Sequence, residues 1–213
     1  MARLRITEIF HSLQGEAASV GWRTVFVRLT GCPLRCGYCD TSYAFKGGEW
    51  WELDAILEQV ASFQARHVTV TGGEPLAQPE CLSLLSALCD VGYHVSLETS
   101  GALDIAAVDP RVVVVMDLKT PASGECARNR YANIELLKPT DQVKFVIADA
   151  DDYAWSREQL ERWDLPARCS VLFSPVFGVI APTDLAEWIL RDRLDVRFQL
   201  QLHKLLWGNE PGR

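Results

Sequence analysis

The stretch TVFVRLTGCPLRCGYCDT, residues 24–41, joins a short apolar run to three closely spaced cysteines. Residues 24–30 are rich in β-branched and aromatic side chains and have the length of a strand. Cys32, Cys36 and Cys39 follow directly. Ligands of parallel α/β sheets gather at the carboxyl ends of the strands. The stretch therefore predicts a strand that leads into a functional loop.

Similar apolar runs recur along the chain, and helical patterns separate several of them. The predicted strands are 24–30, 67–71, 94–98, 112–118, 143–148, 171–173 and 196–202, and the predicted helices are 53–64, 79–91, 151–163 and 183–192, with Asp151 and Thr183 as N-caps of the last two. Strand–helix alternation predicts a parallel sheet with right-handed crossovers. We expect an α/β fold. A parallel-stranded partial or complete (β/α) barrel is the preferred architecture, and an open sheet is the alternative.

Length and composition narrow the class of protein. The 213 residues fit one domain, residues 1–213, and no apolar run is long enough to span a bilayer. The first residues lack the features of a signal peptide, so we expect a cytoplasmic protein with reduced cysteines. The net charge of −7 and the absence of a basic run favour a small-molecule substrate over direct binding of nucleic acid.

The cysteine loop suggests an iron–sulfur cluster with one open iron. Cys32, Cys36 and Cys39 can hold three corners of a cubane, whereas most cubanes have four cysteine ligands. The next cysteine, Cys81, lies far along the chain in a helical pattern, where it and Cys89 fit a buried core. A structural zinc site is the alternative, but it requires a fourth ligand. Cys126 and Cys169 receive no role.

With these residues in view, the sequence resembles the radical S-adenosylmethionine superfamily. The spacing Cys-x-x-x-Cys-x-aromatic-Cys is similar to the superfamily's motif for a [4Fe–4S] cluster. Thr71-Gly72-Gly73-Glu74-Pro75 resembles its second motif, which meets the methionine part of S-adenosylmethionine. Glycines allow close approach to a ligand, and a carboxylate can receive an ammonium group.

Further segments resemble the 7-carboxy-7-deazaguanine synthases of that superfamily. They are Leu13-Gln14-Gly15-Glu16, Phe26-Val27-Arg28, Cys39-Asp40-Thr41, Glu98-Thr99-Ser100-Gly101 and Gln201-Leu202-His203-Lys204. The resemblance implies a radical ring contraction of 6-carboxy-5,6,7,8-tetrahydropterin to 7-carboxy-7-deazaguanine, with loss of ammonia, toward queuosine and related 7-deazapurines. It also implies magnesium, a homodimer, and an electron donor such as flavodoxin or ferredoxin.

The resemblance assigns residues to each ligand. It places Thr41 on magnesium. It assigns S-adenosylmethionine to Tyr38, Cys39, Asp40, Gly72, Gly73, Glu74, Ser100, Asp117, Leu118, Lys119 and Ser174. It assigns the pterin to Leu13, Gln14, Gly15, Glu16, Arg28, Thr71 and His203. Two departures are visible: Asp117-Leu118-Lys119 stands where many members have Ser-Pro-Lys, and residues 205–213 follow the His-Lys pair.

Arg28 also has a physical case of its own. On a strand it shares a face with Phe26 and Thr30, opposite Val25, Val27 and Leu29. A buried Arg needs an anionic partner, and its planar fork suits the substrate carboxylate. A salt bridge to Glu16 or Glu98 is the alternative. At the level of function, another radical enzyme such as a glycyl-radical activase, or a non-catalytic metal-binding module, also stays open.

Overall fold

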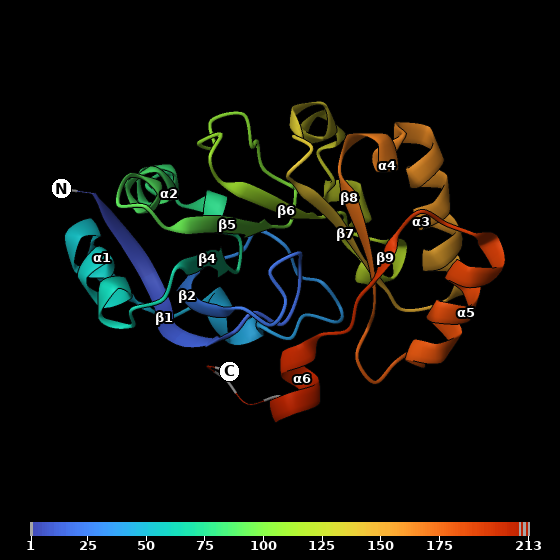
Figure 1. Ribbon diagram of the computed structural model, residues 1–213, viewed down its shortest axis with the longest axis horizontal. Helices are drawn as coiled ribbons and strands as arrows, with labels where there is room; N and C mark the ends of the chain where they lie inside the picture. The colour runs from blue at the N-terminus through green and yellow to red at the C-terminus, as the bar shows by residue number, and fades with distance from the viewer. Residues whose placement is uncertain (1, 209, 211, 213) are drawn as a thin grey trace.

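The fold is built on one twisted sheet that does not close into a ring (Figure 1). The computed structural model describes residues 2–208, 210 and 212. Within that part of the chain, nine strands lie in the order β3-β1-β2-β4-β5-β6-β7-β8-β9. Residues 209, 211 and 213 of the predicted extension lie outside the described residues.

The strands and helices have the following bounds. The strands are β1 Arg3–Leu13, β2 Arg23–Leu29, β3 Glu49–Glu52, β4 His67–Gly72, β5 His94–Thr99, β6 Val113–Asp117, β7 Gln142–Ile147, β8 Ser170–Pro175 and β9 Arg197–Phe198. The α-helices are α1 Leu53–Ser62, α2 Cys81–Asp90, α3 Ala150–Trp163, α4 Leu165–Arg168, α5 Pro182–Asp192 and α6 Leu202–Trp207. Short 3-10 helices are η1 Ser42–Phe45, η2 Pro75–Ala77, η3 Pro121–Ser123, η4 Cys126–Arg128 and η5 Tyr131–Leu136.

Strand β2 and strands β4 to β9 run parallel to one another. Strand β1 is antiparallel to both of its neighbours, β2 and β3. With β3 and β9 at opposite edges, the sheet is a partial barrel. The predicted α/β class and parallel sheet are therefore confirmed.

Successive side chains of each strand point to opposite faces of the sheet, so one face forms the hydrophobic core and the other is more polar. On β2, Val25, Val27 and Leu29 are fully buried, and they join α1 and α2 in one hydrophobic cluster. A second cluster lies under α3 and α5 and contains Phe145 and Phe173. Helices α1 to α5 therefore cover one face of the sheet, which leaves the opposite side chains of β2 and of β4 to β7 for a site.

The structure differs from the sequence predictions at both ends of the sheet. Strand β1 was not predicted, because only Leu4 and Ile6 of its residues are fully buried and its polar residues hide the pattern. The predicted strand 196–202 was wrong beyond residues 197–198, since Leu202 begins α6.

The predicted N-caps were also wrong. Asp149, whose side chain accepts the backbone N–H of Asp152, caps α3, and Ala181 precedes α5. No helix in the described part of the chain is long and apolar enough to cross a membrane.

Candidate active site

The polar face of the sheet opens into a cavity of about 580 Å³. This volume is within the range of small-molecule sites. Its wall combines the cysteine loop, the inward side chains of β2 and of β4 to β7, and α6, which lies beside the loop between β1 and β2 (Figure 1). Segments from both ends of the chain therefore enclose one site.

The three cysteines of the loop all face this cavity. Cys32, Cys36 and Cys39 are half-buried free thiols. Burial raises the pKa of Cys32 and of Cys36. Iron binds thiolates, so loading must displace these protons, and the nearby Lys119 favours that loss. In the described residues no three His, Cys, Asp or Glu side chains are gathered closely enough for a single metal ion. Three free thiols that line one cavity can hold three corners of an iron–sulfur cluster.

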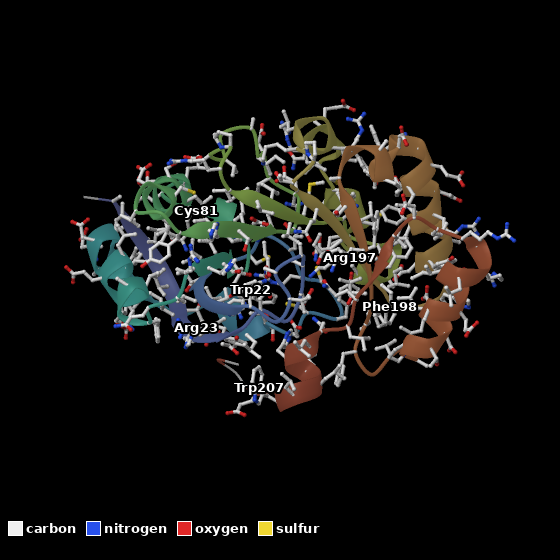
Figure 2. All side chains as sticks on the ribbon, viewed as in Figure 1. Trp22, Arg23, Cys81, Arg197, Phe198 and Trp207 are labelled. Carbon is white, nitrogen blue, oxygen red and sulfur yellow. The ribbon has the colours of Figure 1, made fainter. Side chains whose placement is uncertain are left out.

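Cys81 does not belong to this group. It is fully buried in the hydrophobic cluster beneath α2. Figure 2 labels Cys81 far from α6, which carries Trp207 and closes the cavity. The three-ligand pattern therefore holds among the described cysteines, and the predicted core role of Cys81 is confirmed.

A second loop supports the cysteine loop from behind. The N–H of Gly37 donates to the carbonyl of Ser123 at 3.0 Å, and the N–H of Arg35 donates to Glu125 at 2.5 Å. Asp152 in turn accepts the Thr120 hydroxyl at 3.0 Å and the Ala122 N–H at 2.9 Å. The cysteine loop is thus fixed to the segment that follows β6.

The Gly-Gly-Glu-Pro segment lies against the start of the cysteine loop. The N–H of Glu74 donates to the carbonyl of Gly31 at 2.7 Å. A Cβ on Gly73 would lie 1.9 Å from that carbonyl oxygen, so only glycine fits there. The two sequence motifs are therefore one packed unit.

Glu74 itself differs from the expectation that its carboxylate receives the cofactor's ammonium group. The side chain is fully buried and does not line the cavity. It accepts the Thr99 hydroxyl at 2.9 Å and the Ser100 N–H at 2.7 Å. Glu74 therefore fixes the end of β5, and the adjacent Ser100 and Gly73 face the ligand space instead.

Buried charges form the floor of the cavity. Asp117 and Lys144 are register partners on β6 and β7, and Lys144 Nζ lies 2.7 Å from Glu16 Oε2 and 3.6 Å from Asp117 Oδ2. Lys119 Nζ lies 3.0 Å from Asp117 Oδ2. Burial lowers the pKa of Lys144, but the attraction of Glu16 and Asp117 outweighs it and raises that pKa well above its ordinary value. Burial also opposes the charge of Lys119, but the attraction of Asp117 outweighs it and raises the pKa of Lys119, so both lysines carry charge.

Arg28 lies in the cavity wall but has a partner other than the ones expected. Its Nε donates to Glu8 Oε1 at 2.7 Å, and its Nη1 donates to the Gly72 carbonyl at 3.3 Å. A salt bridge to Glu16 or Glu98 was the predicted alternative, and neither forms. Phe26 shares the cavity face with Arg28, as the strand pattern predicted.

Gln14, Thr71 and Glu98 form a hydrogen-bonded patch on the same face. Gln14 Nε2 donates to Glu98 Oε1 at 3.2 Å, and the Thr71 hydroxyl donates to Glu98 Oε2 at 3.1 Å. Burial, together with repulsion from Glu16, raises the pKa of Glu98. These side chains are therefore pre-arranged before any ligand enters.

The C-terminal helix α6 supplies the last wall. A Cβ on Gly15 would lie 2.1 Å from His203 Nδ1, and the N–H of Leu202 donates to the Gly15 carbonyl at 3.0 Å. Lys204 pairs with Asp40 at 2.7 Å, and Asp40 accepts the Thr41 hydroxyl at 2.9 Å. Burial alone would raise the pKa of Asp40, yet Lys204 holds it well below its usual range.

Most of the predicted residues meet at this cavity. Those that line it are Cys32, Cys36, Cys39, Thr41, Tyr38, Asp40, Gly72, Gly73, Ser100, Asp117, Lys119, Leu13, Gln14, Gly15, Glu16, Arg28, Thr71 and His203. In the described chain, Glu74, Leu118 and Ser174 do not line it. Leu118 is in the core, and Ser174 is buried on β8.

Lys204, which the sequence placed with His203 at the mouth of the site, lines the cavity, whereas Lys144, Glu98 and Gln201 line it without having been assigned a site role from the sequence. One signal was available. Lys144 is the only charged residue in the otherwise apolar run from Val143 to Ile147, which is unusual for a strand covered on both faces.

The fold and the cysteine-lined cavity define a radical S-adenosylmethionine enzyme. A family model described as the radical SAM superfamily matches residues 26–117. The chain is 48% identical to the 7-carboxy-7-deazaguanine synthase of Chlorobaculum tepidum, over 97% of this chain and 96% of that protein. The enzyme of the same name from Koribacter versatilis is 43% identical, over 97% of this chain and 98% of that protein.

The chain therefore belongs to the 7-carboxy-7-deazaguanine synthase family. The crystal structure of QueE from Escherichia coli has the same fold, with a TM-score of 0.74 over 95% of this chain and 96% of that one. At 23% identity, that similarity concerns the fold alone.

Proposed function

We propose that this enzyme converts 6-carboxy-5,6,7,8-tetrahydropterin to 7-carboxy-7-deazaguanine with loss of ammonia, as a radical S-adenosylmethionine carbon–nitrogen lyase. The family membership supports this reaction. The single structural observation that carries it is one cavity in which three free thiols face a wall of buried, paired charges. That combination suits a reactive cofactor beside a polar, anionic substrate.

Cys32, Cys36 and Cys39 would hold the [4Fe–4S] cluster, with Gly73, Ser100, Asp117 and Lys119 around S-adenosylmethionine. When bound, these two cofactors supply a 5′-deoxyadenosyl radical that takes a hydrogen atom from the substrate. The protein contributes binding, orientation and exclusion of water. The hydrogen bond from the Gly37 N–H to the Ser123 carbonyl fixes the cofactor side of the cavity before ligands arrive.

The opposite half of the cavity would receive the pterin. Arg28, held by Glu8 at 2.7 Å, supplies the cation for the substrate carboxylate. Gln14, Glu16 and Thr71 offer hydrogen-bonding groups to the ring, and His203 contributes from α6. Thr41 would be a magnesium ligand, because Mg²⁺ takes few protein oxygens and completes its shell with water and substrate.

The remaining proposals concern the enzyme's surroundings. We propose one catalytic domain that works as a homodimer in the cytoplasm. A low-potential protein such as flavodoxin or ferredoxin would reduce the cluster. These assignments follow the family resemblance of the sequence. The product would enter queuosine or another 7-deazapurine pathway.

Anaerobic reconstitution tests the function directly. The reduced enzyme is incubated with S-adenosylmethionine, with and without 6-carboxy-tetrahydropterin, and the products are separated by chromatography. We expect 7-carboxy-7-deazaguanine and ammonia only when the pterin is present. Cofactor cleavage without that product would indicate a different radical reaction. Absence of cleavage by a fully loaded enzyme would reject the radical assignment itself.

A further inference from the structure

Two buried lysines lie side by side on the floor of the cavity, and each is closest to a different carboxylate. Lys144 Nζ lies 2.7 Å from Glu16, and Lys119 Nζ lies 3.0 Å from Asp117. The four side chains are between 12% and 16% exposed. The 3.6 Å contact from Lys144 to Asp117 connects the two pairs.

The two carboxylates point to different parts of the site. Asp117 ends β6, near the cysteine loop, and its Oδ1 is buried with no partner in the described chain. Glu16 follows Gly15 in the loop after β1, where Gln201 Nε2 donates to its Oε1 at 2.9 Å. Glu16 therefore connects the cavity floor to the segment that carries α6.

Both Glu16 oxygens have one donor from the protein, and a carboxylate can accept about four hydrogen bonds. The remaining acceptor positions suit a ligand with adjacent N–H groups, as on the aminopyrimidinone edge of a pterin. Without Lys144, this carboxylate would lose its closest donor and its compensating charge. A buried carboxylate in that state becomes protonated or turns away.

We propose that Lys144 is a positioning residue for the pterin, because it holds the Glu16 carboxylate in its ligand-accepting orientation. Lys119 performs the same task for Asp117 on the cofactor side. This inference rests on the proposed function, since it takes the pterin as the ligand beside Glu16. Neither lysine forms or breaks a bond in this scheme.

Crossed binding measurements test the proposal. Lys144→Met and Lys119→Met remove one charge each and keep most of the side-chain volume. Each variant is reconstituted anaerobically and titrated calorimetrically with S-adenosylmethionine. Each is then titrated with the pterin at saturating S-adenosylmethionine, without reductant, so that no turnover occurs. Lys144→Met should weaken pterin binding by about tenfold to a hundredfold, the usual cost of removing a partner that orients a ligand-binding group. Its affinity for S-adenosylmethionine should stay within about twofold, and Lys119→Met should show the reverse pattern.

Lys138→Met is the matched control. Lys138 also pairs with a buried carboxylate, Asp141, at 2.8 Å, but neither residue lines the cavity. This variant should lose thermal stability and keep both affinities.

A double variant separates positioning from loss of fold. Lys144→Met with Glu16→Gln removes both partners, so it should regain stability relative to Lys144→Met while pterin binding stays weak. Wild-type pterin affinity in Lys144→Met would overturn the positioning role and leave the proposed function intact. Failure of the wild-type enzyme to bind the pterin would overturn both.

Discussion

Cys36 is the middle cysteine of the loop, and its half-buried thiol faces the cavity beside Lys119. We expect Cys36→Ala to lose iron, sulfide and cofactor cleavage while keeping the circular dichroism of the fold, because no described loop cysteine belongs to a hydrophobic cluster. Cys126→Ala is the control, since Cys126 does not line the cavity. Full cleavage activity in Cys36→Ala would contradict the ligand assignment.

Arg28 is held by Glu8 and aims into the cavity from β2. Arg28→Ala should weaken binding of the carboxylated pterin by roughly thirtyfold or more, the cost of removing one member of a buried charged pair. Binding of S-adenosylmethionine should barely change. Glu8→Gln keeps the cation and should have a smaller effect. Equal losses for both ligands in Arg28→Ala, measured by calorimetry, would instead indicate a structural role.

Glu98 should make stability depend on pH. Burial raises its folded-state pKa above the ordinary 4.5. Between those two pKa values the folded state binds more protons than the unfolded state, so stability falls as pH rises through this window. Glu98→Gln removes the titration and should flatten the slope. Thermal unfolding of both proteins from pH 4.5 upward measures this, and parallel slopes would count against it.

At the scale of elements, the contact between the loop after β1 and helix α6 is the most restrictive. Gly15→Ala would place a methyl group 2.1 Å from His203 Nδ1 and 3.1 Å from the His203 backbone N, so the imidazole must shift and strain the start of α6. We expect faster hydrogen exchange in α6 and weaker pterin binding. Gly15→Ala with His203→Ala gives the methyl group space and should restore protection of the helix. If hydrogen exchange in α6 of Gly15→Ala stayed as slow as in the wild type, the added methyl group would be accommodated without destabilising the helix.

Whether a strand could be predicted from the sequence depended on how completely its side chains are buried. Strands such as β4 and β8, buried on both sides, were visible as runs of β-branched or apolar residues. Strand β1 was not, since it lies between β2 and β3 and most of its side chains are only half-buried. The stretch 196–202 has β-branched and apolar residues, but only its first part finds a pairing partner. Pairing and cover are properties of the assembled sheet and cannot be read from one segment.

The site could be predicted where a motif fixes the backbone. The cysteine loop and Gly73 are of this kind, because spacing and a required glycine are local. The roles of Lys144 and Glu74 were not local. Glu74 is turned away from the cavity by donors on β5, and Lys144 is partnered by Glu16, which lies 128 residues earlier. Such long-range partners depend on the sheet order.

At the scale of the whole molecule, the cluster and the sheet should be separable. The two hydrophobic clusters contain the buried strand faces and helices, and none of the three loop cysteines. Chelation of iron should therefore leave the circular dichroism unchanged and lower the melting temperature by only a few degrees, about 1 kcal/mol in free energy. Faster hydrogen exchange should be confined to residues 32–41 and 120–125. Leu85→Ala, a core change expected to cost about 2–5 kcal/mol, provides the contrasting loss of stability. Global unfolding on chelation would contradict this separation.

A contact next to the cavity wall also sets an order of events during synthesis on the ribosome. Ala17 and Gln199 exchange two hydrogen bonds, and 182 residues separate them. At about 5–20 residues per second, the far partner emerges roughly 10–40 s after the near one. Through that interval the nascent cysteine loop lacks its outer wall. We therefore expect these thiols to be more accessible, both to iron and to oxygen, until the C-terminal segment has been made, and slower translation should lengthen that exposure.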